Sequence, residues 1–300
     1  MSITTGALTQ MLANQLSVQE GSISRLQTQI ATGQQLNSPS DNPTAVTQVL
    51  ALSSQASQLI SWQSNAATAT SWLNAASSTA NEVLQAMQSA STLLLQASNQ
   101  GVQNSSSYQA IGRQLQGVVS NLLDLSNTQF EDRAMFAGTS ASMVAYDSSG
   151  NYLGNGDPPT IVVGPGSGVG QTTVLSVPGT SLFGAGASSV FNVLSTVASA
   201  LLSGTPTSPQ ISSAISGLNS NISAAEQQSA VLGSSSLAVT AASSAITTQL
   251  ADVQANQANL QDLNVTTATT QLNEEMTNYQ AALWAASRAI PETLQQFIAP

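Results

Sequence analysis

The sequence has no cysteine, no histidine and no lysine, and charged residues make up only 6% of its 300 residues. Charged residues usually account for roughly a quarter of a soluble protein. Without cysteine, the chain can form neither a disulfide nor a thiolate nucleophile. Without histidine and lysine as well, it lacks the usual bases of serine catalysis and the ligands of most zinc sites. These absences exclude most classes of enzyme and predict no cofactor and no metal.

Positive charge is scarce too. The only cationic side chains are four arginines, against 14 carboxylates, and the formal net charge is −10. Proteins that bind nucleic acid need a basic face toward the phosphates, and anionic membrane surfaces also attract basic segments. The composition therefore predicts that neither nucleic acid nor a membrane surface is a partner. The arginines are Arg25, Arg113, Arg133 and Arg288.

The polar surface is expected to consist mainly of Gln, Ser, Thr and Asn, whose charge does not change with pH. Such a composition is typical of adaptation to acidic surroundings outside the cell; drift toward small polar residues is the alternative explanation. Residues 1–6 have neither a basic start nor an apolar run, so no cleaved signal peptide is expected. No window holds 18 uninterrupted apolar residues, so no membrane span is expected.

Two long segments carry an apolar residue at every seventh position, which keeps one stripe of a helix facing a partner helix. The pattern predicts helices over about 43–98 and 210–263. The first row is Leu52, Leu59, Ala66, Leu73, Ala80, Met87 and Leu94. The second row is Ile211, Leu218, Ala225, Leu232, Val239, Ile246, Val253 and Leu260. The core seam is expected to include Leu59, Leu73, Met87, Leu232, Val239 and Ile246.

Shorter helices are predicted over about 8–32, 105–136, 188–202 and 266–297. Those at the two chain ends also carry apolar rows, so they are expected to meet partner helices. The expected assembly residues are Leu16, Ile23, Leu26, Ile30, Leu272, Met276, Tyr279, Leu283, Ile290 and Phe297.

Between residues 138 and 186, Gly and Pro separate short β-like runs at 143–146, 160–163 and 172–177, with a turn at 147–151. The predicted fold is mostly α: a long antiparallel coiled-coil bundle formed by both chain ends, with a small β-rich insert in the middle. We expect terminal assembly helices at 1–40 and 265–300. The long helical core would span 41–140 and 187–264, and the insert 141–186 would face outward.

Four motifs suggest chemistry at first sight, and each has a simpler explanation. Glu131–Asp132 and Glu274–Glu275 are adjacent in predicted helices, so each pair should point to different faces and be solvated or ion-paired. The glycine-rich segment 164–170 lacks the Lys-Ser/Thr and the helix of a phosphate loop. Residues 147–151 have the alternate spacing of a calcium loop, but Tyr152 occupies the position of its required glycine. A β-loop and a hairpin turn are the predictions for these two segments.

The segment 29–43 resembles the N-terminal signature of the flagellin superfamily, in which a helix ends in Ser/Thr-Gly before a turn that contains Ser-Asp. Its Pro-Ser-Asp-x-Pro form is similar to that of the hook-associated proteins of the hook–filament junction, whereas flagellins usually have Ala-x-Asp-Asp-Ala. The segments 130–139, 177–184 and 279–283 resemble three further parts of the same family. The signature turn comprises Gly33, Pro39, Ser40, Asp41 and Pro43.

This resemblance implies a structural subunit of the bacterial flagellum, exported by the type III apparatus and located outside the cell. It implies a homo-oligomeric ring or protofilament, with terminal helices in an inner tube. The implied partners are the preceding junction protein, flagellin, and an export chaperone on the C-terminal helix. Two alternatives remain: a short flagellin that forms the filament itself, and an extracellular coiled-coil adhesin or surface-layer protein.

Overall fold

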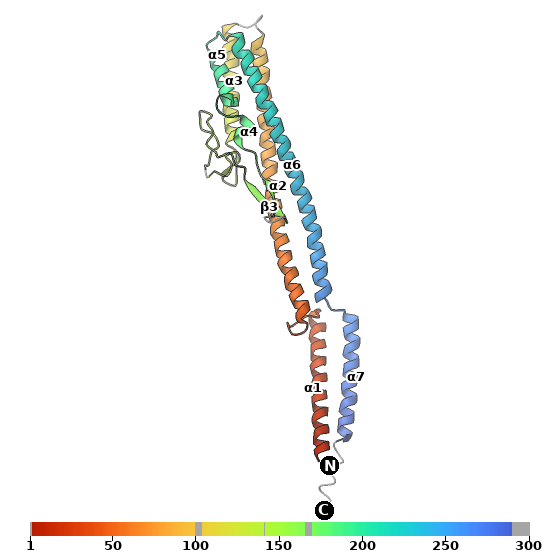
Figure 1. Ribbon diagram of the computed structural model, residues 1–300. Helices are drawn as coiled ribbons and strands as arrows, with labels where there is room; N and C mark the ends of the chain where they lie inside the picture. The colour runs from red at the N-terminus through yellow and green to blue at the C-terminus, as the bar shows by residue number, and fades with distance from the viewer. Residues whose placement is uncertain (1, 100–103, 141, 166–169, 290–300) are drawn as a thin grey trace, which may run out of the picture. The chain divides into compact units, whose positions relative to one another are not determined.

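The computed structural model describes all residues except 1, 100–103, 141, 166–169 and 290–300 (Figure 1). The long helices are α1 (Ser2–Thr32), α2 (Pro43–Ser98), α3 (Ser105–Ser126), α5 (Val190–Leu202), α6 (Ser208–Gln261) and α7 (Val265–Ala289). The short elements are β1 (Gln129–Phe130), β2 (Arg133–Ala134), β3 (Thr160–Gly164), β4 (Gln171–Val174), α4 (Gly179–Phe183) and the 3₁₀ helix η1 (Gly186–Ser188). The predicted mostly α fold with a small β-rich insert is confirmed.

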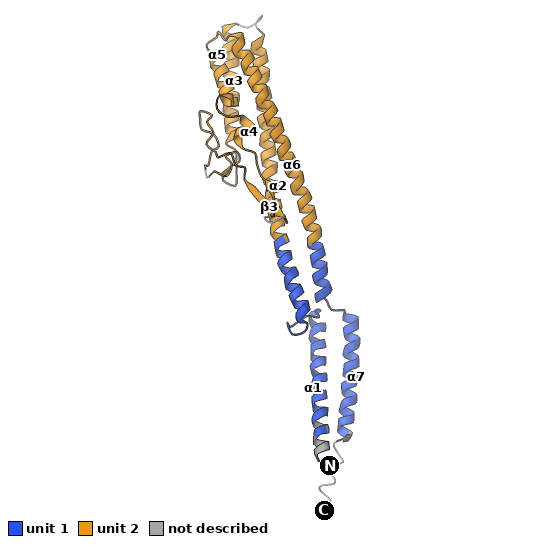
Figure 2. Cartoon of the chain, in the orientation of Figure 1, with its two compact units in different colours: residues 1–58, 250–300 blue, residues 59–249 orange. Residues whose placement is uncertain are grey.

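The chain divides into two compact units, coloured in Figure 2. Unit 1 comprises residues 1–58 and 250–300, and unit 2 comprises residues 59–249. Unit 1 therefore holds both chain ends, whereas unit 2 holds the greater part of α2 and α6 together with everything between them.

The core of unit 2 is built from the predicted heptad rows. Every residue from Leu59 to Leu94 in the first row is buried, and so is every residue from Ile211 to Val239 in the second. Alanine fills the neighbouring row of α2 at positions 69, 76, 90 and 97, which lets helices approach closely. The six core-seam residues have exposed fractions of Leu59 1%, Leu73 0%, Met87 0%, Leu232 0%, Val239 0% and Ile246 2%.

The α6 helix is also long and apolar enough to cross a membrane by length and composition, with a window of mean hydropathy 1.3. Its heptad residues Leu218 and Leu232 are fully buried in unit 2. Ser, Thr, Asn and Gln occupy many of its exposed positions. This division into an apolar seam and a polar outer face is typical of a core helix in a soluble bundle.

The third helix is shorter than predicted, since α3 ends at Ser126 and not at residue 136. The Asn127 side chain accepts hydrogen bonds from the backbone N–H groups of Ala145 (2.8 Å) and Tyr146 (2.9 Å), which turns the chain out of the helix. The β1–β2 hairpin follows, and its turn residues Glu131 and Asp132 have φ of 48° and 60°. Their expected helical placement was therefore wrong: both carboxylates lie on a two-residue turn.

The insert contains fewer strand residues than predicted. β3 and β4 pair antiparallel from Thr160↔Val174 to Gly164↔Gln171, and the predicted run 143–146 contributes only the bridge Tyr146↔Tyr152. The turn at 147–151 is confirmed, because the Asp147 carboxylate accepts backbone N–H bonds from Ser149 and Asn151. The glycine-rich segment joins β3 to β4, although its residues 166–169 lie outside the described part of the chain.

Aromatic side chains hold the insert together. The Tyr146 ring lies 4.9 Å from that of Phe191 and 5.5 Å from that of Phe183, measured between ring centroids. Phe183 also contacts Phe136, just after the β1–β2 hairpin, at 5.8 Å. The cluster thereby connects the hairpin, the insert and the start of α5 into one core.

Candidate assembly interface

In unit 1 the break between α1 and α2 is hydrogen-bonded to the break between α6 and α7. The backbone N–H of Gln35 donates to the Gln261 carbonyl (2.8 Å), and that of Leu263 donates to the Gly33 carbonyl (2.9 Å). The Gln35 side-chain amide also donates to the Leu260 carbonyl (2.8 Å). Because both breaks share these bonds, α1 and α7 leave the long helices at the same level.

The signature turn forms a local hydrogen-bonded structure. The Asp41 carboxylate accepts from the backbone N–H groups of Asn37 (3.0 Å) and Ser38 (2.7 Å). The Asn42 side chain then accepts from the Ala45 N–H (3.1 Å) and caps α2. Gly33 ends α1 with φ of 69°, a conformation that favours glycine. Pro39, Ser40 and Pro43 are exposed around this turn. The turn thus has a structural role within unit 1.

The α1 and α7 helices pack side by side without a dry seam. Among the described side chains of α1, none is fully buried. On α7, the small residues Ala268 and Ala286 are buried, whereas Met276 and Leu283 are each 41% exposed. The expected assembly residues that lie half-buried are Leu16, Ile23, Leu26, Ile30, Leu272 and Tyr279. The last two expected residues, Ile290 and Phe297, lie outside the described residues.

Unit 1 exposes five further apolar side chains that are not among the expected assembly residues. Met11 and Val18 are seven positions apart, so their spacing was a signal for this pair, whereas Leu50 has no apolar residue seven positions before or after it other than Pro43. Their distribution contrasts with the closed seam of unit 2. The exposed fractions are Met11 69%, Val18 69%, Leu50 63%, Val265 50% and Trp284 68%.

A polar cleft of about 720 Å³ lies in unit 1 between α1, the signature turn and α7. Its charged lining residues are Arg25, Asp41, Glu274 and Glu275. Glu274 and Glu275 both line this cleft, Glu274 as an exposed residue and Glu275 as a half-buried one. No salt bridge joins an arginine to a carboxylate among the side chains that the structure describes. The same part of the chain holds no group of three or more potential metal ligands.

Few carboxylates are engaged in specific interactions. Hydrogen bonds from the Asn151 side chain and backbone, and from the backbone of Ser149 and Gly150, lower the pKa of the exposed Asp147 carboxyl below its ordinary value of 3.8. A depressed folded pKa stabilises the fold above the unfolded pKa, and this contribution is lost as pH falls through the folded value. Acid should therefore weaken this turn as pH falls below the ordinary carboxyl range and through the lowered pKa of Asp147.

We accordingly expect the monomer to tolerate acid, with a thermal midpoint that falls by less than about 15 °C between about pH 7 and about pH 3. The physical reason is that the described side chains form no ion pair between an arginine and a carboxylate that protonation could break. Asp147→Asn removes the carboxylate of the turn, and we expect its thermal midpoint to change with pH as that of the parent chain does. Circular dichroism melts at each pH provide the measurement, and a larger fall in the parent chain would contradict the expectation.

Comparison with known proteins is consistent with this architecture. Residues 3–141 match the family model of the bacterial flagellin N-terminal helical region. FlgL from Bacillus cereus superimposes with a TM-score of 0.59 and 18% identity, covering 69% of this chain and 99% of that one. A protein from Vibrio parahaemolyticus described as a flagellar hook-associated protein gives a TM-score of 0.67 and 17% identity, covering 74% and 100% of the two chains. No curated protein sequence matches the chain.

At these identities the two solved structures establish a shared fold and no more. The family-model match concerns the N-terminal part of the chain, residues 3–141, which is similar to the helical region that begins a bacterial flagellin.

Proposed function

We propose that this chain is a structural subunit of the bacterial flagellum that joins the hook to the filament, as a hook-associated protein 3. Its flagellin N-terminal region and its fold, shared with FlgL of Bacillus cereus and the hook-associated protein of Vibrio parahaemolyticus, support the proposal. The Pro39–Pro43 turn favours a junction protein over a flagellin, because it has the Pro-Ser-Asp-x-Pro form.

The observation that carries the proposal is the incomplete packing of α1 and α7. A helix with an apolar stripe requires a partner, since helices gain most of their stability from packing. Trp284 is 68% exposed, so covering it would bury on the order of 100–170 Å² more, which contributes roughly 2.5–4 kcal/mol at about 25 cal/mol per Å². Neighbouring copies would cover this surface, with Leu16, Ile23, Leu272 and Met276 among the contacting residues.

The partners follow from this assignment. Copies of the chain would form a homo-oligomeric ring, with the preceding hook-associated junction protein on one side and flagellin on the other. An export chaperone would cover the C-terminal helix before type III export. The protein would reside in the flagellum, outside the cell. Its role would be mechanical and not enzymatic.

A short flagellin remains the main alternative, and an extracellular adhesin or surface-layer coiled coil is the other. A flagellin is distinguished by polymerisation of the purified chain alone into long filaments. An adhesin or surface-layer protein would leave the flagellum unaffected when its gene is removed.

The decisive experiment removes the gene and restores it with variants on the exposed face of α7. Leu283→Asp places a charge on this face, and we expect cells with normal hooks, no attached filaments and flagellin released into the medium. Leu153→Asp, at a similarly exposed leucine in the insert, is the matched control and should restore filaments. Electron microscopy of the cells and immunoblots of the medium provide the measurement.

Normal filaments with Leu283→Asp would contradict the assembly role of α7. Loss of all filament protein from both cells and medium in the deletion strain would instead identify the chain as the filament subunit.

A further inference from the structure

The loop that leads from the Tyr146↔Tyr152 bridge to β3 contains the only asparagine in the sequence that is followed by a glycine, Asn155–Gly156. Glycine has no Cβ, so nothing on the residue itself shields its backbone nitrogen. That nitrogen can attack the side-chain carbonyl carbon of the preceding asparagine and close a five-membered ring. Of all the asparagines in the chain, Asn155 is therefore the one whose neighbour least hinders loss of its amide.

The reaction needs only water as a co-reactant. A bond forms between the Gly156 nitrogen and Asn155 Cγ, the bond from Cγ to Nδ2 breaks, and Nδ2 leaves as ammonia with the proton that the Gly156 nitrogen gives up. Water then adds to one of the two carbonyl carbons of the ring and opens it. The product is an aspartate, or an isoaspartate in which the main chain runs through Cγ. Either product carries a carboxylate in place of the neutral amide.

The side-chain amide of Asn155 is hydrogen-bonded at both of its polar atoms. Its Nδ2 donates to the Thr139 hydroxyl (2.6 Å), and its Oδ1 accepts from the backbone N–H groups of Thr139 (3.1 Å) and Asp157 (3.3 Å). The backbone N–H of Asn155 also donates to the Ala137 carbonyl (3.3 Å). Asn155 thus joins this loop to the segment that follows the β1–β2 hairpin.

The attacking nitrogen is hydrogen-bonded as well. The Gly156 N–H donates to the Tyr152 hydroxyl (3.3 Å), which itself donates to the Phe136 carbonyl (3.0 Å). Gly156 has φ of 78°, and a Cβ at this position would meet no atom within 4 Å. The backbone conformation, and not close packing, therefore calls for glycine here. Ring closure requires the Asn155 amide and this N–H to leave their partners together.

Solvent has access to the pair. The Asn155 residue is exposed and Gly156 is half-buried, so burial does not keep water from the amide. The restraint on the reaction therefore comes from the hydrogen bonds of the loop. A typical hydrogen bond shifts an equilibrium by a factor of roughly five, so several of them together can slow ring closure substantially.

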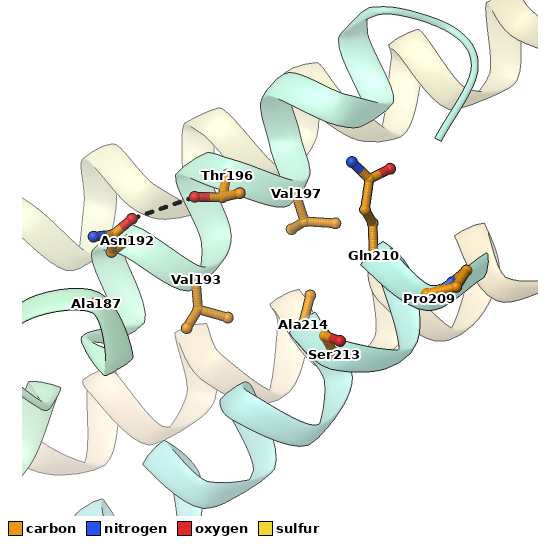
Figure 3. A pocket seen from close by; sticks show the side chains of 9 residues that line it. All are labelled: Ala187, Asn192, Val193, Thr196, Val197, Pro209, Gln210, Ser213 and Ala214. Atoms are coloured by element: carbon orange, nitrogen blue, oxygen red, sulfur yellow. Dashed lines mark hydrogen bonds between the residues drawn. The ribbon is translucent and has the colours of Figure 1, made fainter. Parts of the chain in front are cut away.

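Asn192, at the start of α5, is an equally exposed asparagine in a different setting. Figure 3 shows its side chain with the hydrogen bond that it accepts from the Thr196 hydroxyl (3.3 Å). The residue that follows it, Val193, has a branched Cβ, and its backbone N–H donates to the Ser189 carbonyl (3.0 Å). A bulky neighbour and a helical hydrogen bond both oppose attack at Asn192. At Asn155 only the hydrogen bonds of a loop oppose it.

We propose that Asn155 is a spontaneous deamidation site, and that the hydrogen bonds to Thr139 and Tyr152 set the rate. While the loop is closed the amide persists, and each opening gives the Gly156 nitrogen access to Cγ. The new carboxylate has no N–H to donate to Thr139 and lies close to Asp157 in the chain, so the converted loop opens more readily. The site thereby records loop opening irreversibly. It belongs wholly to unit 2 and does not depend on the proposed junction role.

The test compares the purified full-length chain with a synthetic peptide of residues 150–160, which has the same Asn-Gly pair but lacks Thr139. Both are incubated at the same temperature and at mildly alkaline pH, and mass spectrometry of proteolytic fragments follows the conversion of Asn155 to aspartate and isoaspartate. We expect the peptide to convert at least about tenfold faster than the chain, because several hydrogen bonds must open in the chain. Asn192 should stay intact.

Two variants with matched controls assign the restraint to named groups. Thr139→Val removes the acceptor of the Asn155 amide, and Tyr152→Phe removes the acceptor of the backbone N–H, so each should speed conversion about fivefold. Thr172→Val, at an exposed threonine of β4, should convert like the parent. So should Tyr146→Phe, which removes a hydroxyl without a hydrogen-bond partner among the described residues. Circular dichroism at the incubation temperature verifies that each variant is folded.

Three results would overturn the proposal. The first is that Asn155 stays intact in the peptide, since the pair would then not be a deamidation site. The second is that the folded chain converts as fast as the peptide, since the fold would then impose no restraint. The third is that Thr139→Val and Tyr152→Phe, both folded, convert at the parent rate. Conversion of Asn192 alongside Asn155 would indicate general unfolding and would likewise count against a rate set by this loop.

Discussion

Leu232→Asp is expected to unfold unit 2 at room temperature. The Leu232 side chain is 0% exposed and lies in the seam of α6. Replacing it removes a buried leucine, at about 2–5 kcal/mol, and buries an unpaired carboxylate, at about 3–5 kcal/mol. The sum is comparable with the roughly 5–15 kcal/mol that stabilises a typical domain. Leu73→Asp, at an equally buried position of α2, should have the same effect.

Leu237→Asp is the matched control, because it makes the same substitution on the same helix at a residue that is 74% exposed. Its thermal midpoint should stay within a few degrees of the parent. Asp157→Ala, at an exposed position of the insert, should also leave the helical signal unchanged. Circular dichroism at 222 nm and thermal melts provide the measurement. If Leu73→Asp melted within about a degree of the parent, the assignment of the heptad seam would be wrong.

Removal of residues 1–40 or 265–300 is expected to leave a folded helical core while abolishing filament attachment. The hydrophobic core cluster lies wholly between residues 66 and 242, so neither truncation removes any of its members. Each truncation instead removes α1 or α7, whose described apolar residues larger than alanine are half-buried or exposed in the single chain. The circular dichroism signal at 222 nm should therefore fall only in proportion to the number of helical residues that are deleted.

Both truncated chains should be tested alongside the parent, by circular dichroism in solution and by filament attachment in cells. Loss of most of the helical signal on either truncation would mean that the terminal helices are needed to fold unit 2. Retained filament attachment with a folded core would instead contradict the division of the chain into assembly helices and core.

The parts of the fold that could be predicted from the sequence are those formed by interactions between residues close together in the chain. The long helices α2 and α6 were predictable because an apolar residue at every seventh position marks a helical seam directly in the sequence. Pro43 and Asn42 marked the start of α2 by local capping chemistry. The signature turn was likewise evident, because its hydrogen bonds join residues within five positions of one another.

The end of α3 could not be predicted, because Asn127 leaves the helix through bonds to residues 18 and 19 positions further on. The bond between Gln35 and Leu260 spans 225 positions, so the link between the two helix breaks left no local pattern. The aromatic cluster around Tyr146 likewise joins rings from separate segments, since Phe183 and Phe191 lie 37 and 45 positions further on. The sequence by itself thus determined the helices and the family resemblance, since both follow from local spacing. Only the tertiary structure decided which apolar residues remain uncovered, because burial depends on contacts between distant segments.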